Sequence, residues 1–386
     1  MSDEDGHIQI GLRDRSGLSE ALLTVSDPAL KLMALMDGES TCEDIRRRFA
    51  WQIGQRVPVD ALLRLLETLV KAHFLEGPGF ESYYEGRLRA YRSAGLRDMP
   101  HAGAMGIVDT SGEPFKKMLD GLPSAAPSRP VRGLVAPHLD FPRGEPCYVA
   151  AYGALRTRKK PSRVVVLGTN HFGRALSVVA TISNFATPLG TTRVDSAFLE
   201  ELEKECGNLR TYELDHLREH SIELQVLWLQ HLFGPDNIEI VPILCPDPCG
   251  PTETAPADGK GVDLADFART LGYLVGTDDR DTLIVAGADL SHVGAAFGDE
   301  RTLDDAFLEE VRQRDTTLLH SLSLSDPAGF LRLAAQNGNA TRVCSAGCIF
   351  VLVTALRGTT GTLLRYHQAV DEATQTCVTC AAMLFT

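Results

Sequence analysis

From residue 131 onward, short runs of apolar and β-branched residues alternate with segments in which apolar residues recur every three or four positions. The short runs predict strands, and the longer segments predict amphipathic helices. We expect four strands, at Val131–Ala136, Arg163–Gly168, Ile238–Leu244 and Thr282–Gly287. Because strands that alternate with helices form a sheet with crossover helices on its faces, residues 131–386 are predicted to form an α/β domain.

Residues 1–85 carry helix signals in place of strands. Ser26 begins a Ser-Asp-Pro helix start that precedes an apolar stripe. Thr41 and Asp44 have the spacing of a capping box for a second helix, and the apolar positions within Leu62–Leu69 predict a third. Phe74–Gly77 is expected to form a short strand or turn. The pattern therefore predicts a small helical N-terminal domain.

Residues 86–130 join these two parts. They are rich in Gly, Pro, Ser and Arg and end in a run of prolines and small residues at Pro123–Pro130. This composition is typical of linkers and surface loops, so we expect a linker at 86–130 that leads into the main domain.

Charge and cysteine content narrow the range of functions. A net charge of −13 opposes binding to nucleic acid, and the three arginines at 46–48 are expected on the solvated face of a helix. No uninterrupted apolar run reaches about 18 residues, so neither a membrane span nor a membrane partner is expected. The acidic N-terminus does not resemble a signal peptide, and nine cysteines do not suggest a secreted disulfide framework. We expect a cytoplasmic protein.

Polar side chains follow three of the four predicted strands. His138 follows the first strand, His171 the second, and Asp289 and His292 the fourth. In open α/β sheets the loops at the carboxyl ends of the strands converge, and ligands bind there. Imidazole nitrogens at such an edge can hold iron, copper or zinc with coordination positions left open. Asp289 and His292, in a loop, can form a proton-transfer pair in which the carboxylate holds one histidine tautomer.

A helix is predicted to open near Glu219 and to continue to His231. His220 and Glu223 are three residues apart on one face, where they can orient a substrate, support a ligating imidazole or bind metal themselves. The alternative is an ordinary helix start, because carboxylates are favoured near the positive end of the helix dipole. The same structural alternative applies to the other candidates, which would then be hydrogen-bonded loop residues and an Asx turn.

Three cysteine pairs have spacings that suggest a structural zinc or iron–sulfur site: Cys245 with Cys249, Cys344 with Cys348, and Cys377 with Cys380. The last pair argues against such a cluster, because it falls on a predicted strand, where residues three apart point to opposite faces. The chain also lacks a glycine-rich phosphate loop and a Gly-x-Ser-x-Gly motif, so nucleotide hydrolysis and α/β-hydrolase chemistry are not expected.

Eight blocks, in order, resemble the MEMO family, which includes AmmeMemoRadiSam system protein B and shares its fold with LigB-type class III extradiol dioxygenases. They are PHAG at 100–103, APHLDF at 136–141, LGTNHFG at 167–173, ATPLGTTRVD at 186–195, EHSIELQVLWL at 219–229, VPIL at 241–244, AGADLSHVG at 286–294 and TRVCSAG at 341–347. The resemblance covers roughly residues 100–386. It implies an α/β fold with a central mixed sheet flanked by helices.

The resemblance also implies a site. The family's metal ligands fall on His138, His171 and Cys344, where a thiolate replaces the carboxylate of the LigB-type dioxygenases. Its pocket residues fall on Glu219, His220, Asp289 and His292. Fe(II) is the expected metal, with copper or zinc as alternatives. The sequence departs from the family in three of these blocks, which read TNHF, APHLDF and VCSAGCI here and lack a histidine, a tyrosine and a basic loop common in the family. The resemblance therefore does not identify the substrate.

The N-terminal stretch DGESTCEDIRRRF…LLRLLETLVKAHFLEG resembles winged-helix modules related to PqqD, which bind peptides. A plain structural appendage is the alternative. For the whole chain we expect a non-heme iron oxidoreductase that acts with O₂ on a small molecule or peptide. The alternative is a non-catalytic scaffold that binds peptides or proteins in the inherited pocket. The family name implies AMMECR-type and radical-SAM proteins as partners.

Overall fold

In the computed structural model, the described residues are 9–99, 113–119 and 129–386. The chain divides into two compact units, Met1–Ala90 and Tyr91–Thr386. The PHAG block and most of the proline-rich stretch before residue 131 lie outside the described residues. Within the described ranges, no helix has both the length and the apolar character needed to cross a bilayer.

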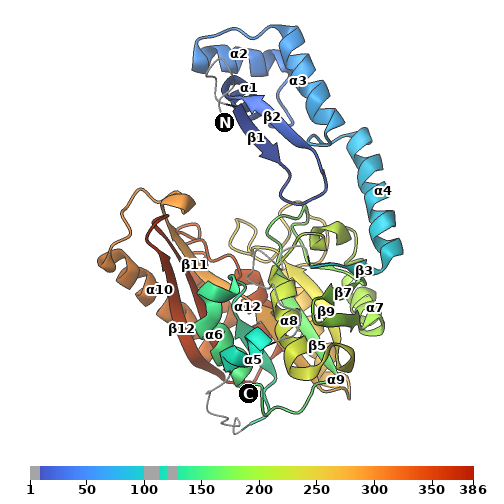
Figure 1. Cartoon of the computed structure of the whole chain (residues 1–386), viewed down its shortest axis with the longest axis vertical. Coiled ribbons are helices and arrows are strands. Elements are labelled where there is room, and N and C mark those ends of the chain that lie inside the picture. Colours follow the sequence, from blue (N-terminus) through green and yellow to red (C-terminus); the bar gives the residue numbers. More distant parts are fainter. Residues whose placement is uncertain (1–8, 100–112, 120–128) are drawn as a thin grey trace. The chain divides into compact units, whose positions relative to one another are not determined.

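The first unit contains the three predicted helices, α1 (Asp27–Met33), α2 (Cys42–Ile53) and α3 (Val59–Lys71), visible in Figure 1. Thr41 and Asp44 form the predicted capping box, in which each side chain bonds the other residue's backbone N–H. The helices pack around Leu32, Phe49 and Leu62.

The first unit also holds an antiparallel hairpin of β1 (Gln9–Arg13) and β2 (Leu22–Ser26), which the sequence reading missed. Both strands are short and mostly half-buried or exposed, so they lack a long apolar run. Residues 74–77, expected to be a short strand or turn, contain no strand.

Helix α4 (Pro78–Ala94) corrects the expected start of the linker at residue 86. Phe80, Tyr84 and Tyr91 lie on this helix at spacings of four and seven, and all three are buried. Gly86 and the arginines suggested a loop, but burial of these three aromatic side chains stabilises a helix through the same residues. Two short elements follow, β3 (Leu96–Arg97) and α5 (Glu113–Leu119).

The second unit is built on a mixed sheet with the order β11-β13-β4-β10-β5-β9-β8-β7-β3, to which β12 and β6 add as partners of β13 and β9. Strands β4, β10, β5 and β9 are parallel neighbours and correspond to the four predicted strands. The remaining bounds are β4 Gly133–Ala136, β5 Arg163–Thr169, β6 Val179–Ala180, β7 Asn184–Thr187, β8 Gly190–Val194, β9 Glu239–Cys245, β10 Thr282–Gly287, β11 Asp289–Gly294, β12 Gly361–Asp371 and β13 Thr376–Phe385.

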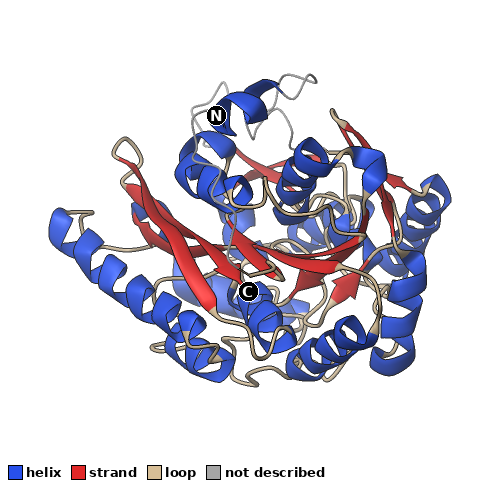
Figure 2. Cartoon of the chain, turned by 90° about the horizontal axis from the view of Figure 1, so that it is seen from below, coloured by secondary structure: helices blue, strands red, loops and turns tan. Residues whose placement is uncertain are grey.

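Helices cover both faces of this sheet (Figure 2). Helices α6 (Phe141–Gly153) and α8 (Ser221–Phe233) pack on one face, where Tyr152 and Trp228 stack with their ring centres 5.1 Å apart. The other face carries α7 (Ser196–Cys206), α9 (Leu264–Thr277), α10 (Asp305–Ser323), α11 (Pro327–Ala334) and α12 (Ala346–Ala355). The predicted fold class, a mixed α/β sheet flanked by helices with a helical N-terminal part, is confirmed.

Two glycines let α8 begin directly against the sheet. A methyl group on Gly287, at the end of β10, would lie 2.5 Å from the carbonyl oxygen of Ser221. A methyl group on Gly168, on β5, would lie 2.5 Å from the hydroxyl of the same serine. The start of α8, and with it the segment just before it, therefore lies close to the carboxyl ends of β5 and β10.

We expect Gly287→Ala to lower the free energy of unfolding by about 1 to 3 kcal/mol, because the added methyl group forces α8 away from β10. Urea denaturation followed by circular dichroism measures this. Gly276→Ala on α9 is the matched control: its methyl group meets open space, so the substitution should be neutral or stabilise by up to about 1 kcal/mol. Equal stability of the two variants would contradict the close approach.

Candidate metal centre

Three histidines meet at the carboxyl edge of the sheet. His138 follows β4, His171 follows β5, and His220 immediately precedes α8. One ring nitrogen from each histidine lies within 4.8 Å of the other two, and His138 is buried while the others are half-buried. Among the described His, Cys, Asp and Glu residues, these three form the group whose spacing suits one metal ion. The structure therefore adds His220, expected as a pocket residue, to the candidate ligands.

Each histidine has its Nδ1 atom next to an oxygen. The Nδ1 of His138 lies 2.9 Å from the carbonyl oxygen of Gly287, and the Nδ1 of His171 lies 3.0 Å from the Glu219 carboxylate. The Nδ1 of His220 lies 3.4 Å from the same carboxylate. A carbonyl oxygen only accepts, so it holds the proton on Nδ1 and leaves Nε2 with a free lone pair, as in histidines that bind metal.

Glu219 is the buried anion under two of these rings. Its carboxylate also accepts the backbone N–H groups of His171, at 3.0 Å, and Ser221, at 2.9 Å. Burial opposes ionisation of Glu219, but His171, His220 and the backbone N–H of Ser221 together outweigh burial and lower the pKa of the carboxyl far below its ordinary range. Burial likewise opposes the charged form of His171, yet Glu219 raises the pKa of that ring.

Cys344 lies in the turn before α12, with its Sγ 3.5 Å from the Nε2 of His138. Burial raises the pKa of this thiol, but His138 and His171 outweigh burial and bring the pKa down to about 6. The next residue, Ser345, fixes the turn, because its hydroxyl lies 3.0 Å from that of Thr169 and accepts the N–H of Asp289 at 3.1 Å. Cys344 thus borders the histidine group as a readily ionised sulfur.

Asp289 joins the site from β11. One carboxylate oxygen accepts the N–H of His138 at 3.1 Å, and the other lies 3.5 Å from the Nε2 of the same ring. Burial raises the pKa of Asp289 to about 6, against the opposing effect of His292. His292 lies on the same strand, with its Nδ1 3.1 Å from the carbonyl oxygen of Leu290, and burial lowers its pKa.

The predicted loop at Asp289–His292 is wrong, because this segment is strand β11, paired antiparallel with β13. On a regular strand, residues three apart point to opposite faces. The pairing register shifts between Asp289 and His292, as at a β-bulge, and an irregularity of this kind re-aims a side chain. Asp289 and His292 interact electrostatically.

Glu223 does not join the histidines, which corrects the predicted pairing of His220 with Glu223. It forms a buried ion pair of 2.5 Å with Arg97. The Arg97 guanidinium also donates to the backbone carbonyl oxygens of His216 and Glu219. Helix α8 starts at Ser221, so His220 is its N-cap rather than a residue inside it.

Two residues that sequence reasoning missed hold the loops of the site. Arg97 fixes the segment before α8, and Asp215 fixes the segment after His171. The Asp215 carboxylate accepts the backbone N–H groups of Arg174 and Ala175 and the side-chain amide of Asn170, at 3.0 to 3.1 Å. Neither residue belongs to a motif with chemical meaning, so burial in the folded chain is the signal that identifies them.

The cysteine pairs do not form a metal cluster among the described residues. Cys377 packs with Val293 and Val311, whereas Cys380 packs among the residues between the sheet and α6. The two side chains leave opposite faces of β13, as the strand pattern predicts.

Comparisons with known proteins identify similar proteins. The family described as Memo-like protein matches residues 97–384. A MEMO1 family protein of Aquifex aeolicus is 25% identical over 384 residues, which cover 97% of this chain and 95% of the relative. One from Thermotoga maritima is 36% identical over 197 residues, 49% of this chain and 63% of the relative. An uncharacterized protein of Escherichia coli K12 aligns in structure over 66% of this chain and all of its own, with 14% identity and a TM-score of 0.38.

The family match extends over most of the chain and includes every candidate residue of the metal centre. The predicted resemblance is therefore confirmed: the chain belongs to the Memo-like protein family.

Proposed function

We propose that this protein binds one redox-active metal ion at His138, His171 and Cys344 and acts as a metal-dependent oxidoreductase. The observation that carries the proposal is the convergence of three imidazole nitrogens within 4.8 Å of one another, bordered by the Cys344 sulfur 3.5 Å from the Nε2 of His138. Each Nδ1 faces an oxygen that can hold a proton there, so Nε2 is the nitrogen that binds the metal once it has lost its own proton.

Iron is the proposed metal, with copper as the closest rival. Imidazole suits iron, copper and zinc, and a thiolate beside it favours metals with some affinity for sulfur over magnesium or calcium. Bound iron would supply one-electron exchange with dioxygen or with an oxidisable small molecule. Zinc would satisfy the same donors but has no redox chemistry.

The chain's own residues supply orientation and proton transfer in this proposal. Glu219 holds the rings of His171 and His220, and Asp289 holds the backbone at His138. His292 is kept neutral by burial and has its Nδ1 bonded to a carbonyl oxygen. Its Nε2 atom is then the proton acceptor, as required of a general base.

Iron binding by four variants tests the proposed ligands. Anaerobically purified protein loaded with Fe(II) should hold about one iron per chain by elemental analysis. His138→Ala and His171→Ala should lower iron affinity by at least about 100-fold, because each removes a ligand. Cys344→Ser should also weaken binding and should abolish any sulfur-to-metal charge-transfer absorption. Cys42→Ser is the matched control, since this exposed cysteine lies in the first unit and should change neither property.

His220→Ala tests whether the third ligand is the Cys344 thiolate or the His220 imidazole. If His138, His171 and Cys344 bind the metal, His220→Ala should weaken iron binding by less than about tenfold, while Cys344→Ser has the larger effect. A larger loss of iron binding in His220→Ala than in Cys344→Ser would mean that the third ligand is the His220 imidazole and not the Cys344 thiolate. Substoichiometric iron and copper in the loaded wild type, unaffected by any of these variants, would contradict the metal site altogether.

Glu219→Gln tests the support beneath the rings. The amide keeps the size of the side chain but removes the charge that holds two imidazoles, so iron affinity should fall by about 10- to 100-fold. Competition with a chelator measures this. Glu213→Gln is a comparison at a second buried carboxylate, which bonds Arg92 and Thr181 instead of a histidine, and should leave iron affinity unchanged.

Proton transfer is tested with the metal in place. His292→Gln should keep iron binding within about threefold of wild type and lower oxygen consumption by about 100-fold, the range expected for a general base. An oxygen electrode and the iron content of the same samples give both numbers. Equal oxygen consumption by the variant and the wild type would remove His292 from the reaction.

A further inference from the structure

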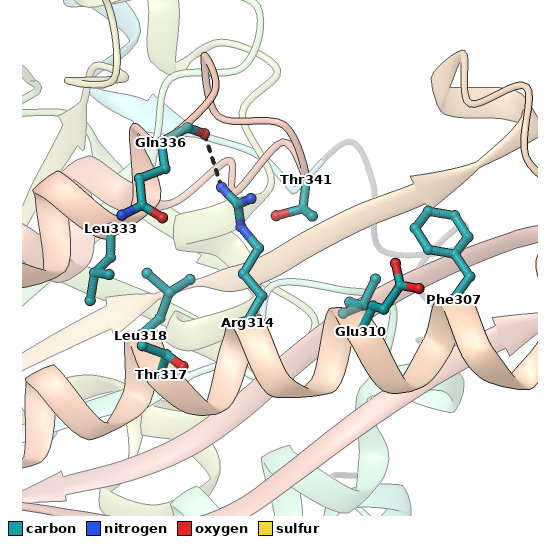
Figure 3. A pocket seen from close by; sticks show the side chains of 9 residues that line it. Phe307, Glu310, Arg314, Thr317, Leu318, Leu333, Gln336 and Thr341 are labelled. Atoms are coloured by element: carbon teal, nitrogen blue, oxygen red, sulfur yellow. Dashed lines mark hydrogen bonds between the residues drawn. The ribbon is translucent and has the colours of Figure 1, made fainter.

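A cavity of about 390 Å³ lies along α10, and none of the three histidines lines it. Figure 3 shows Arg314 rising from α10 into it, with Gln336 and Thr341 across from the helix. Val311, Leu318 and Leu333 provide apolar walls. A volume of this size lies near the lower end of the range for small-molecule sites.

Arg314 is the cationic group of this cavity, and its hydrogen bonds are incomplete. One terminal nitrogen donates to the carbonyl oxygen of Gln336 at 3.1 Å, and its contact with that of Ala334 is longer, at 3.5 Å. The Nε–H is buried, and it has no hydrogen-bond partner within the part of the chain that the structure describes. A buried charged donor without an acceptor is unfavourable, so a ligand that supplies an acceptor would be favoured there.

The nearby carboxylates are already bonded elsewhere. Glu310, on the rim, receives both terminal nitrogens of Arg301, at 2.6 and 3.0 Å. Asp315 is close enough to interact with Arg314 electrostatically, but its oxygens accept hydroxyl groups of three residues: Ser291, Thr379 and Tyr366. Neither carboxylate bonds the buried Nε–H of Arg314.

We propose that this cavity binds a small organic monocarboxylate. One carboxylate oxygen accepts the Nε–H of Arg314 and the other accepts a neighbouring N–H of the same guanidinium, the two-point geometry that arginine favours. An aliphatic chain then packs against Val311, Leu318 and Leu333. Inorganic phosphate fits less well, because three apolar walls cannot replace its hydration. This proposal does not depend on metal binding or oxidation at the histidines.

Hexanoate is the probe, measured by isothermal titration calorimetry on the full-length chain. We expect saturable one-to-one binding with a Kd in the low millimolar range or below, as about eight non-hydrogen atoms allow. Arg314→Gln should weaken this binding at least tenfold. Arg312→Gln is the matched control on the same helix: Arg312 is exposed and bonds Gln368 and Glu309, so hexanoate binding should be unchanged.

Leu333→Trp tests the same cavity if Arg314→Gln fails to fold. Leu333→Trp fills the cavity and retains the guanidinium, so hexanoate binding should be lost while thermal unfolding remains cooperative. Hexanol and inorganic phosphate are the comparison ligands. Hexanol binding as tight as hexanoate binding would make the site purely apolar and overturn the proposal. Tighter binding of phosphate, or no saturable hexanoate binding up to about 20 mM, would overturn it as well.

Discussion

The parallel pairing of β4, β10 and β5 is the constraint on which the site depends. Ala136 pairs with Gly287, and Leu167 pairs with Ala286, so three strands end at nearly the same level. A polar side chain follows the end of each of these strands within one to three residues. Backbone hydrogen bonds within a buried sheet therefore set the backbone positions of His138, His171 and Asp289 relative to one another.

A set of buried polar groups then fixes the loops that the sheet has brought together. Glu219 bonds the backbone and the ring of His171, and Ser345 ties the turn of Cys344 to the ends of β5 and β10. Buried polar groups are stable when each finds its partners, and a partly satisfied network is costly. The Glu219 carboxylate and the Ser345 hydroxyl, which are not among the proposed ligands, thus hold the loops that carry them.

Strand β11 connects the candidate metal centre to the rest of the C-terminal half. Its Ser291 hydroxyl bonds the buried carboxylate of Asp315 on α10 at 2.6 Å, and the N–H of His292 bonds the carbonyl oxygen of Thr341 at 2.7 Å. Thr341 also lines the cavity at Arg314. The strand that carries His292 is therefore held by the same helix and loop that line the cavity at Arg314.

Local pattern in the sequence determined much of the fold. The apolar runs located β4, β5, β9 and β10, and the capping box located the start of α2, because strand periodicity and helix capping depend on neighbouring residues. His138 and His171 followed from their places after strands. Cys344 came from family resemblance alone, since its spacing to Cys348 carries no information about the histidines.

Only the tertiary structure decided which polar groups meet. Glu219 reaches His171 across 48 positions of sequence and Arg97 reaches Glu223 across 126, distances at which local periodicity carries no signal. The segment Asp289–Gly294 is a strand because β13 pairs with it, whereas its sequence alone suggested a loop. His220 lies beside His138 and His171 for the same reason: its position is set by the packing of α8 against two glycines of the sheet, which the residues around it do not encode.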